Sequence, residues 1–331
     1  MSPRSSAIER LASPRPRPVE VLAWLLPALA FFLVPDNLAL GVSIMTYAVA
    51  VLALDLVLGY AGIVSLGHAA FFGVGAYTAG LLAVQGWKEP LTGLLLAGAV
   101  SLALGFLASF LVVRGKDLTR LMVTLGIGLV VYELANRLSS VTGGMDGLSG
   151  FEIGPIFGVF SFDLYGRTAW WYVYGVLILV FVLLRLVVSS PFGLSLRAIR
   201  EGVSRMPALG ASVDQRLRIA FTLSAGVTGI AGGLLAQTTQ FVGIDSLSVG
   251  RSADFLVMLV LGGTGRLYGA LIGTTVFMIA HDYLADMNPV YWEFWMGLLL
   301  MAVVLFARGG VVGAGRRLLQ TVKTKFARAA P

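Results

Sequence analysis

Five long stretches of this sequence carry almost no charged side chains, and this feature limits the possible fold more than any other. They run from Val21 to Val34, Leu38 to Leu58, Leu91 to Val113, Tyr172 to Val188 and Phe294 to Phe306. A bilayer core about 30 Å thick is crossed by a helix of roughly 20 apolar residues. Only 12% of the residues are charged, against about 25% in soluble domains. The sequence therefore predicts an all-α, polytopic bundle of transmembrane helices.

The rest of the composition limits the kinds of bond and binding site that the chain can form. The 41 glycines would let helices approach closely in a membrane. The absence of cysteine excludes disulfides and thiolate ligands, and the two histidines, His68 and His281, argue against a zinc site. The net charge of +7 comes from basic residues at helix ends and in short loops, which is the positive-inside pattern rather than a nucleic-acid surface. We expect no cofactor in this chain.

The basic residues also predict the topology. Residues 1–18 are expected to form a disordered basic cytoplasmic tail, with a cleaved signal peptide as the competing interpretation. Residues 19–310 form the predicted transmembrane domain, and residues 311–331 a second basic cytoplasmic tail. A count of ten membrane-spanning segments places both termini and every basic loop on the cytoplasmic side. The helices are expected near 20–34, 38–58, 59–84, 91–113, 118–138, 168–187, 219–239, 253–285 (two helices) and 291–307.

Two of these segments are open to another interpretation. Residues 59–84 and 253–268 could be re-entrant, which would leave eight full spans, because non-helical backbone at membrane depth is tolerated where protein buries it. The acidic loop 139–167 and residues 240–252 are expected outside. The arginine-rich segment 189–215 is expected inside.

That inner segment predicts a short amphipathic helix over 191–206. Pro191 suits its first turn, with Ser190 as a possible cap, and Gly210 suits the end of the segment. Leu196 and Ile199 fall on neighbouring helical positions. Such a helix could lie on the membrane or dock into a groove of a partner protein.

No enzyme motif is present. The sequence contains no H-E-x-x-H, no G-x-S-x-G, no P-loop and no carboxylate pair beside a histidine, so this chain is not expected to be an enzyme or to hydrolyse ATP. Active transport would need a partner or an ion gradient. A stand-alone secondary transporter would need carboxylates at mid-depth, for which Asp55 is the one good candidate. An intramembrane enzyme would need a catalytic pair.

Ionisable residues within the predicted helices are functional candidates, because their burial in a membrane is costly. Asp55 could cap a broken helix or line a pathway, and His68 could bond unwound backbone through both ring nitrogens or contact a substrate. The others lie near predicted helix ends, where solvation is the simpler interpretation. They are Glu133, Asp254, His281 and Asp282.

A glycine-rich stretch, 59–80, predicts a discontinuous helix. It contains six glycines, and broken helices near the membrane midplane often build transporter sites. Close packing of helices on small residues is the competing explanation.

The order of four motifs resembles one family, the permease subunits of branched-chain amino-acid ABC importers. The first motif comprises Leu58 to Gly62, Ser65 to Gly73 and Gly75 to Tyr77; the second, Thr142 to Gly144 with Asp146 to Leu148; the third, Pro191 to Gly193, Arg197 to Arg200 and Ala208 to Gly210; the fourth, Leu261 to Gly263 with Gly265 and Gly269. They follow the family order over residues 58–270, and the subtype resembled is the longer of two paired permeases.

The resemblance implies import of branched-chain or other hydrophobic amino acids across a bacterial inner membrane. The implied partners are a homologous second permease, two cytoplasmic ABC ATPases and a periplasmic substrate-binding protein. ATP-driven closure of the ATPases would rock the permeases between two states. The family also includes importers of urea and of aromatic or short-chain acids, so the cargo stays open.

The resemblance also implies two sets of site residues. Substrate-pathway candidates are Asp55, Gly62, Ser65, Gly67, His68, Phe71, Tyr77, Thr142, Gly143 and Gly144. ATPase-coupling candidates are Ser195, Arg197, Ala198, Arg200, Glu201, Arg205, Leu209 and Gly210. The chain departs from the family pattern at 202–204, which lack the usual acidic residues, at Pro207, expected to interrupt the amphipathic helix, and at Arg266.

Overall fold

The computed structural model describes residues 18–33, 35–115, 117–163, 165–289, 291–292, 294–298, 301 and 310. The tail expected at 311–331, nearly all of the tail expected at 1–18 and much of the helix expected at 291–307 lie outside these residues.

The described chain is helical, which confirms the all-α prediction. Its helices are α2 (Pro18–Leu33), α3 (Leu38–Asp55), α4 (His68–Val84), α5 (Pro90–Arg114), α6 (Asp117–Arg137), α7 (Ser139–Thr142), α8 (Arg167–Ser189), α9 (Pro191–Glu201), α10 (Val213–Thr239), α11 (Val249–Gly262) and α12 (Leu267–Met287). Short 3-10 turns are η1 (Pro35–Asn37), η3 (Gly144–Asp146), η4 (Val203–Arg205), η5 (Pro207–Leu209) and η6 (Ile244–Leu247), and η2 (Leu56–Tyr60) is a π-helical turn.

Within the described residues, five helices are long and apolar enough to cross a membrane, or six if the bent pair α11–α12 counts as one span. The five cover Pro35–Tyr60, Pro90–Arg114, Asp117–Arg137, Arg167–Ser189 and Val213–Thr239. The number of eight to ten expected from sequence therefore depends on α2, α4 and the pair α11–α12, and on the helix expected at 291–307, much of which lies outside the described residues. The fold is that of a multi-pass membrane protein.

The boundaries of α3, α5, α6 and α8 lie within a few residues of the predicted ones, whereas α10 begins earlier than predicted. This helix begins at Val213 rather than near residue 219, so Arg216 and Arg218 lie on it instead of in a loop. The guanidinium of Arg218 lies 4.7 Å from the ring centroid of Phe110 on α5. A long arginine side chain can lie along an apolar surface in this way, and this allows the helix to continue through charged positions.

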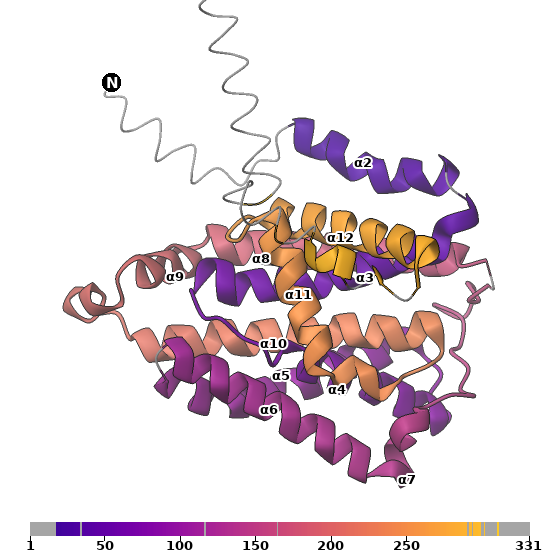
Figure 1. Cartoon of the computed structure of the whole chain (residues 1–331), viewed down its shortest axis with the longest axis horizontal. Helices are drawn as coiled ribbons and strands as arrows, with labels where there is room; N and C mark the ends of the chain where they lie inside the picture. Colours follow the sequence, from indigo (N-terminus) through magenta and orange to yellow (C-terminus); the bar gives the residue numbers. More distant parts are fainter. Residues whose placement is uncertain are drawn as a thin grey trace, which may run out of the picture.

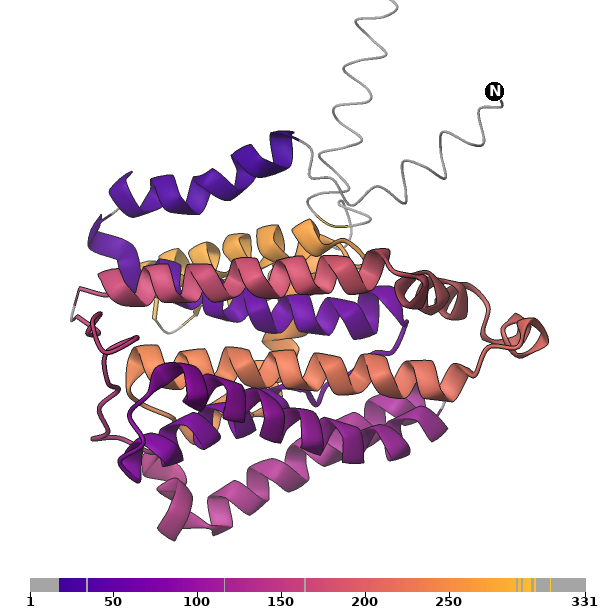
Figure 2. The same ribbon diagram turned by 180° about the vertical axis from the view of Figure 1, so that it is seen from behind.

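Helices α3 and α10 form the centre of the bundle. α10 packs against α5, α4 and α3, while α3 also packs against α8, α12 and α11. Most long helices run along one axis, and α2 lies at one edge, where Trp24 packs against Phe181 of α8 (Figure 1). Seen from behind, α8, α10 and α5 run nearly parallel (Figure 2). We call the two ends of this bundle the α9 end and the α7 end.

Small residues let α4 and α10 approach until backbone meets backbone. A Cβ atom on Gly232 would collide with the carbonyl group of Phe72, and one on Gly75 would collide with that of Gly229. On the other side of α10, the Cβ of Ala225 occupies the space that a side chain on Gly105 of α5 would need. The abundant glycines therefore do serve helix packing, as one sequence interpretation held.

Two segments of the chain cross the bundle from one end to the other, and each is part helix and part irregular chain. Residues 61–67 run from the α9 end to the start of α4, which continues to the α7 end. The second crossing starts at the α7 end, where Val242 lies beside Gly80, and reaches Leu247 beside Gly73. Gly73 and Gly80 are seven residues apart on α4, so the chain from Val242 to Leu247 advances about 10 Å into the bundle.

The second crossing then continues through α11 to the α9 end. There, Asp55 at the end of α3 accepts a hydrogen bond of 2.7 Å from the Gly265 N–H. The chain turns by 115° between α11 and α12. Residues 243–252, expected outside, pack beside α4 instead of forming a loop free of the bundle, and the side of the membrane on which they lie stays a prediction. Irregular backbone is tolerated there because protein surrounds it.

Candidate functional site

The most closely connected group of predicted site residues lies where α3 ends, at the α9 end of the bundle. The Ala61 N–H donates to the Leu56 carbonyl at 3.2 Å, a π-type bond, and the Ile63 N–H donates to the Val57 carbonyl at 3.0 Å. The Gly59 carbonyl instead accepts a hydrogen bond from the Arg200 guanidinium. The broken helix predicted from the glycine-rich stretch is therefore present, and an arginine from α9 bonds to its backbone.

Asp55 connects the same break to the turn between α11 and α12. Its carboxylate is fully buried and accepts from the Gly265 N–H. The Arg200 guanidinium also interacts electrostatically with it. A Cβ on Gly59 would overlap both the Asp55 carboxylate and the Gly265 nitrogen, so only glycine fits there. Three segments distant in sequence thus meet at Gly59, and Asp55 joins α3 to the turn between α11 and α12. Its role in a substrate pathway stays a prediction.

Helix α9 forms because the sequence supplies a start and a buried face. Ser190 caps it by accepting from the Gly193 N–H at 3.4 Å, as predicted, and Pro191 occupies its first turn. Leu196 and Ile199 are buried. The guanidinium of Arg197 lies 5.0 Å from the ring centroid of Tyr60. Together with the Arg200 contact, these side chains fix α9 against the break in α3.

The amphipathic helix is shorter than predicted. It ends at Glu201 rather than near residue 206, because Gly202 follows with an extended backbone. Pro207 does not interrupt a helix but opens the turn η5. That turn closes at Gly210, whose left-handed conformation (φ 75°) favours glycine. The lack of a long helix explains how the segment accommodates Pro207.

The opposite face of this segment is open. Ala198 and Glu201 are exposed on α9, Leu194 is 54% exposed, and Leu209 is 77% exposed beyond it. Arg205 and Gly210 are exposed as well, while the Ser195 hydroxyl is used within α9, where it donates to the Phe192 carbonyl. The coupling candidates therefore divide into two groups. Arg197 and Arg200 contact the bundle, although Arg200 is also exposed, and the others remain accessible or bond locally.

His68, the first residue of α4, is held by two hydroxyl groups. Its Nδ1 lies 2.9 Å from the Ser65 hydroxyl and its Nε2 2.9 Å from the Ser224 hydroxyl on α10. The Ser224 hydroxyl donates its only proton to the Ala53 carbonyl at 2.6 Å, so it accepts from His68 Nε2–H. The imidazole therefore carries a proton on Nε2, and its Nδ1 lies within hydrogen-bond distance of the Ser65 hydroxyl. Its partners are hydroxyls rather than the unwound backbone expected from sequence.

We expect Ser224→Ala to destabilise the protein by about 1–3 kcal/mol, because it leaves the buried His68 Nε2–H without a partner and removes the hydroxyl bond to the Ala53 carbonyl. Thermal unfolding in detergent, followed by the loss of the monodisperse peak, measures this. Ser140→Ala is the matched control, since Ser140 is exposed at the α7 end. Equal unfolding temperatures for the two variants would contradict the proposed network.

The outer-loop motif forms a separate group at the other end of the bundle. The Thr142 hydroxyl donates to the Ala135 carbonyl at 2.6 Å, and Gly143 and Gly144 have positive φ angles of 76° and 59°. The following residues pair with the chain after α10, since Leu148 and Val242 exchange backbone hydrogen bonds of 2.9 and 3.0 Å. The structure therefore does not bring Thr142 to Gly144 together with Asp55 and His68.

The remaining pathway candidates are packed within the chain. Phe71 is buried against Phe221, and Tyr77 is 6% exposed. A Cβ on Gly67 would collide with the Thr124 carbonyl, and Gly62, at φ 76°, lies against the side chain of Arg200. Ser65 is buried beside His68. Their role in a substrate pathway stays a prediction.

Sequence reasoning missed two polar residues. Gln237, buried near the end of α10, donates to the Pro90 carbonyl at 2.6 Å and accepts from the Tyr172 hydroxyl at 2.7 Å, joining α5, α8 and α10. The sequence signal that could have identified Gln237 was a single amide side chain within an apolar stretch. Arg251 was missed because the predicted helix began at 253. Asp254 on the same helix was noted, but its neighbours were placed outside the bundle.

Comparisons with known proteins agree with the motif order. The family described as branched-chain amino acid transport system / permease component matches residues 38–304. The chain is 30% identical to the high-affinity branched-chain amino acid transport system permease protein LivM of Salmonella typhimurium, over 87% of this chain and 73% of that protein. It is 30% identical to LivM of Escherichia coli, over 80% and 67% respectively. It is 25% identical to the permease protein LivH of Escherichia coli, over 81% and 91%. No solved structure matches the chain.

Proposed function

Because the chain belongs to the branched-chain amino acid transport system permease family, we propose that it is an ABC importer subunit carrying branched-chain or other hydrophobic amino acids into the cytoplasm. The match covers residues 38–304, which include the break in α3, the whole of α9 and the turn between α11 and α12. The relatives LivM and LivH are both permeases of one transport system, which supports pairing with a homologous second permease.

The observation that carries the proposal is the two-sided character of α9. Its inner face is fixed to the bundle by Leu196 and Ile199 and by the Arg200 bond to Gly59. Its outer face presents Leu194, Ala198 and Glu201, at successive helical turns. A cytoplasmic ATPase would bind this outer face of α9. Movement of α9 would then carry the Gly59 carbonyl with it and shift Gly59 against Gly265.

The orientation follows from this assignment. The α9 end would be cytoplasmic, which agrees with its arginines and the positive-inside bias, and the α7 end would face a periplasmic substrate-binding protein. Both termini would be cytoplasmic, and the membrane would be the bacterial inner membrane. The chain itself would carry no catalytic group, and the ATPases would supply the energy.

The test is leucine uptake into proteoliposomes that contain this chain, its second permease and the two ATPases. We expect uptake that requires both ATP and the substrate-binding protein. Uptake by this chain alone, driven by a proton gradient, would contradict the proposal and support a secondary transporter. Uptake of urea or an aromatic acid in place of leucine would retain the ABC importer and replace its cargo.

We expect Leu209→Asp to reduce co-purification of the ATPases by about tenfold, the effect of losing about 1.4 kcal/mol of contact energy. Leu209 is 77% exposed at the α9 end, and a charge there would oppose burial in a partner's groove. The matched control is Val159→Asp, because Val159 is 75% exposed in the loop at the α7 end. Pull-down of the tagged permease measures both. Equal recovery of ATPase in the two variants would exclude Leu209 from the interface.

A further inference from the structure

The end of α2 and the start of α8 enclose a cavity of about 260 Å³ at the α7 end of the bundle. Its wall consists of Phe31 and Phe32 from α2, Pro35 from η1, Leu38 from α3, and Tyr165 and Arg167 at the start of α8. The side chains of Phe32 and Tyr165 are 72% and 77% exposed, so the cavity opens to the surroundings of the bundle. The wall is apolar and aromatic apart from Arg167.

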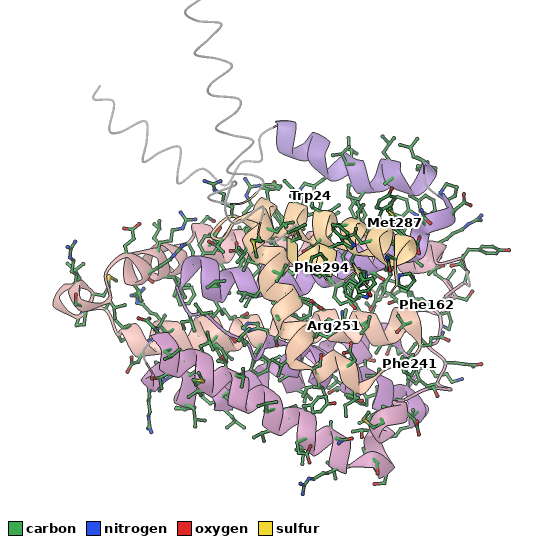
Figure 3. All side chains as sticks on the ribbon, viewed as in Figure 1. Trp24, Phe162, Phe241, Arg251, Met287 and Phe294 are labelled. Carbon is green, nitrogen blue, oxygen red and sulfur yellow. The ribbon has the colours of Figure 1, made fainter. Side chains whose placement is uncertain are left out.

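Aromatic rings hold α2 beside α8. Trp24 points from α2 toward the bundle (Figure 3), and its ring centroid lies 4.8 Å from that of Phe181 on α8. Closer to the cavity, the ring centroid of Phe31 lies 6.1 Å from Trp170 and 5.3 Å from Trp171. The cavity therefore lies beside the last of these contacts, where the chain alone does not fill the space between the two helices.

The cavity lies at the level where membrane-spanning helices meet water. The candidate spans Pro35–Tyr60 and Arg167–Ser189 both begin at residues of its wall. Tyrosine and tryptophan are enriched at this level in membrane proteins, because each has an apolar ring and a polar group. Tyr165, Trp170 and Trp171 follow that pattern. Phospholipid head groups occupy the same level, so the cavity opens toward them.

Two donor groups beside the cavity have no partner within the described residues. Trp170 is 6% exposed, and its indole N–H is buried without a hydrogen-bond acceptor. The guanidinium of Arg167 lies 5.7 Å from the ring centroid of Tyr165, and no carboxylate of the described chain lies within 4 Å of it. Arg167 and Trp170 are three positions apart on one face of α8. Buried polar groups are nearly always paired, so an acceptor from outside the chain is expected here.

The charges around the cavity match a head group that carries both signs. Asp36 is exposed and directly follows Pro35 of the wall. The carboxylate of Asp163 accepts from the Thr168 N–H at 3.1 Å, so its charge is already compensated by the N-terminus of α8. One cation, Arg167, and one carboxylate, Asp36, are therefore left for a ligand. A guanidinium binds phosphate well, and a carboxylate attracts an ammonium group.

We propose that this cavity binds one phospholipid with a primary ammonium head group, taken from the leaflet at the α7 end. Its phosphate pairs with Arg167, its ammonium group pairs with Asp36, and part of an acyl chain fills the apolar space. An oxygen of the lipid accepts from the indole N–H of Trp170. The lipid thereby joins the end of α2 to the start of α8. The proposal goes beyond transport, because it depends on neither the cargo nor the ATPases.

Titration with phospholipids of identical acyl chains tests the head group. The protein is extracted with the subunits that accompany it and delipidated by detergent exchange, and lipid binding is followed by native mass spectrometry. We expect phosphatidylethanolamine to bind about fivefold more tightly than phosphatidylcholine or phosphatidylglycerol. The quaternary ammonium of phosphatidylcholine cannot donate a hydrogen bond to Asp36, and phosphatidylglycerol carries no cation.

Substitutions in the wall locate the site. Arg167→Gln should weaken phosphatidylethanolamine binding about fivefold, the effect of one basic residue at a lipid surface. Arg137→Gln is the matched control, because Arg137 is exposed at the same end and does not line the cavity. Asp36→Asn should lower the affinity for phosphatidylethanolamine to that for phosphatidylcholine, while Asp146→Asn, also at an exposed position at the α7 end, should not.

A third substitution tests the cavity itself. Leu38 is 4% exposed in the wall, and Leu38→Trp should fill the space and weaken binding of all three lipids. Unchanged lipid binding by a folded Leu38→Trp variant would overturn the proposal. Arg167 and Asp36 are exposed, so their variants should fold and keep the test decisive if Leu38→Trp does not.

The proposal stands only if phosphatidylethanolamine is preferred and both exposed substitutions weaken its binding. Phosphatidylglycerol bound as tightly as phosphatidylethanolamine would overturn it, and so would equal lipid binding by Arg167→Gln and Arg137→Gln. The absence of a tightly bound lipid on the wild-type protein would show that only exchangeable membrane lipid reaches the cavity. Lipid binding needs neither ATP nor cargo, so a failure of leucine uptake would instead count against the proposed function.

Discussion

Gly232→Val is expected to abolish recovery of the folded permease from membranes. A Cβ at this position would collide with the Phe72 carbonyl and approach the Ala76 nitrogen, both on the backbone of α4. Overpacking a core that can relax costs about 1–3 kcal/mol. Here the obstacle is helix backbone, so α4 and α10 must separate and the contacts of Gly75 with Gly229 are lost with them. We therefore expect a loss beyond that range. The measurement is the monodisperse fraction after detergent extraction.

Gly175→Val provides the control for this experiment. Gly175 is also a mid-helix glycine, but a Cβ there meets nothing within 4 Å. The two variants share the same change in helix propensity, so a difference between them reports packing alone. Normal recovery of Gly232→Val would show that the close approach of α4 and α10 is incorrect.

Arg200→Glu is expected to lower ATP-driven uptake about 10- to 100-fold while the ATPases remain bound and active. The substitution replaces a donor to the Gly59 carbonyl with an acceptor, and it places a second carboxylate near Asp55. A hydrogen bond to a charged group contributes about 1.5–3 kcal/mol, which corresponds to that range of rates. The outer face of α9 is unchanged, so ATPase binding should persist. Uptake and ATP hydrolysis measured on the same proteoliposomes separate the two effects.

Two further variants make this result specific to Arg200. Arg200→Lys keeps a cationic donor and should retain part of the uptake. Arg114→Glu makes the same charge change at an exposed position at the α9 end and should leave uptake near the wild-type level. If Arg200→Glu impaired ATPase binding and uptake in equal proportion, Arg200 would belong to the ATPase interface instead of the link to Gly59.

Much of the fold was predictable from sequence because it depends on local patterns. Stretches of membrane length with few charges predicted α3, α5 and α8 within a few residues, and Ser190 with Pro191 predicted the start of α9. The clustered glycines predicted the break after Asp55. These signals work because helix length, capping and backbone freedom are each decided within a few neighbouring residues.

The contacts between distant segments could not be predicted in this way. Nothing near Asp55 in the sequence indicates that its partner is Gly265, and nothing near His68 indicates Ser224. The packing of residues 243–251 was not predicted either, because their charge and polarity are typical of a loop in water. The contact of Leu247 with Gly73 shows that this polar segment packs against α4.

The hydroxyl partners of His68 bear on the electrical integrity of the membrane. A proton relay needs every member to accept a proton on one side and release one on the other. The chain from Ser65 through His68 to Ser224 ends at the Ala53 carbonyl, which can only accept, and begins at the Gly67 amide, which does not release its proton. A titratable ring buried among helices is thereby closed at both ends, so this hydrogen-bonded chain offers a proton no route along the bundle.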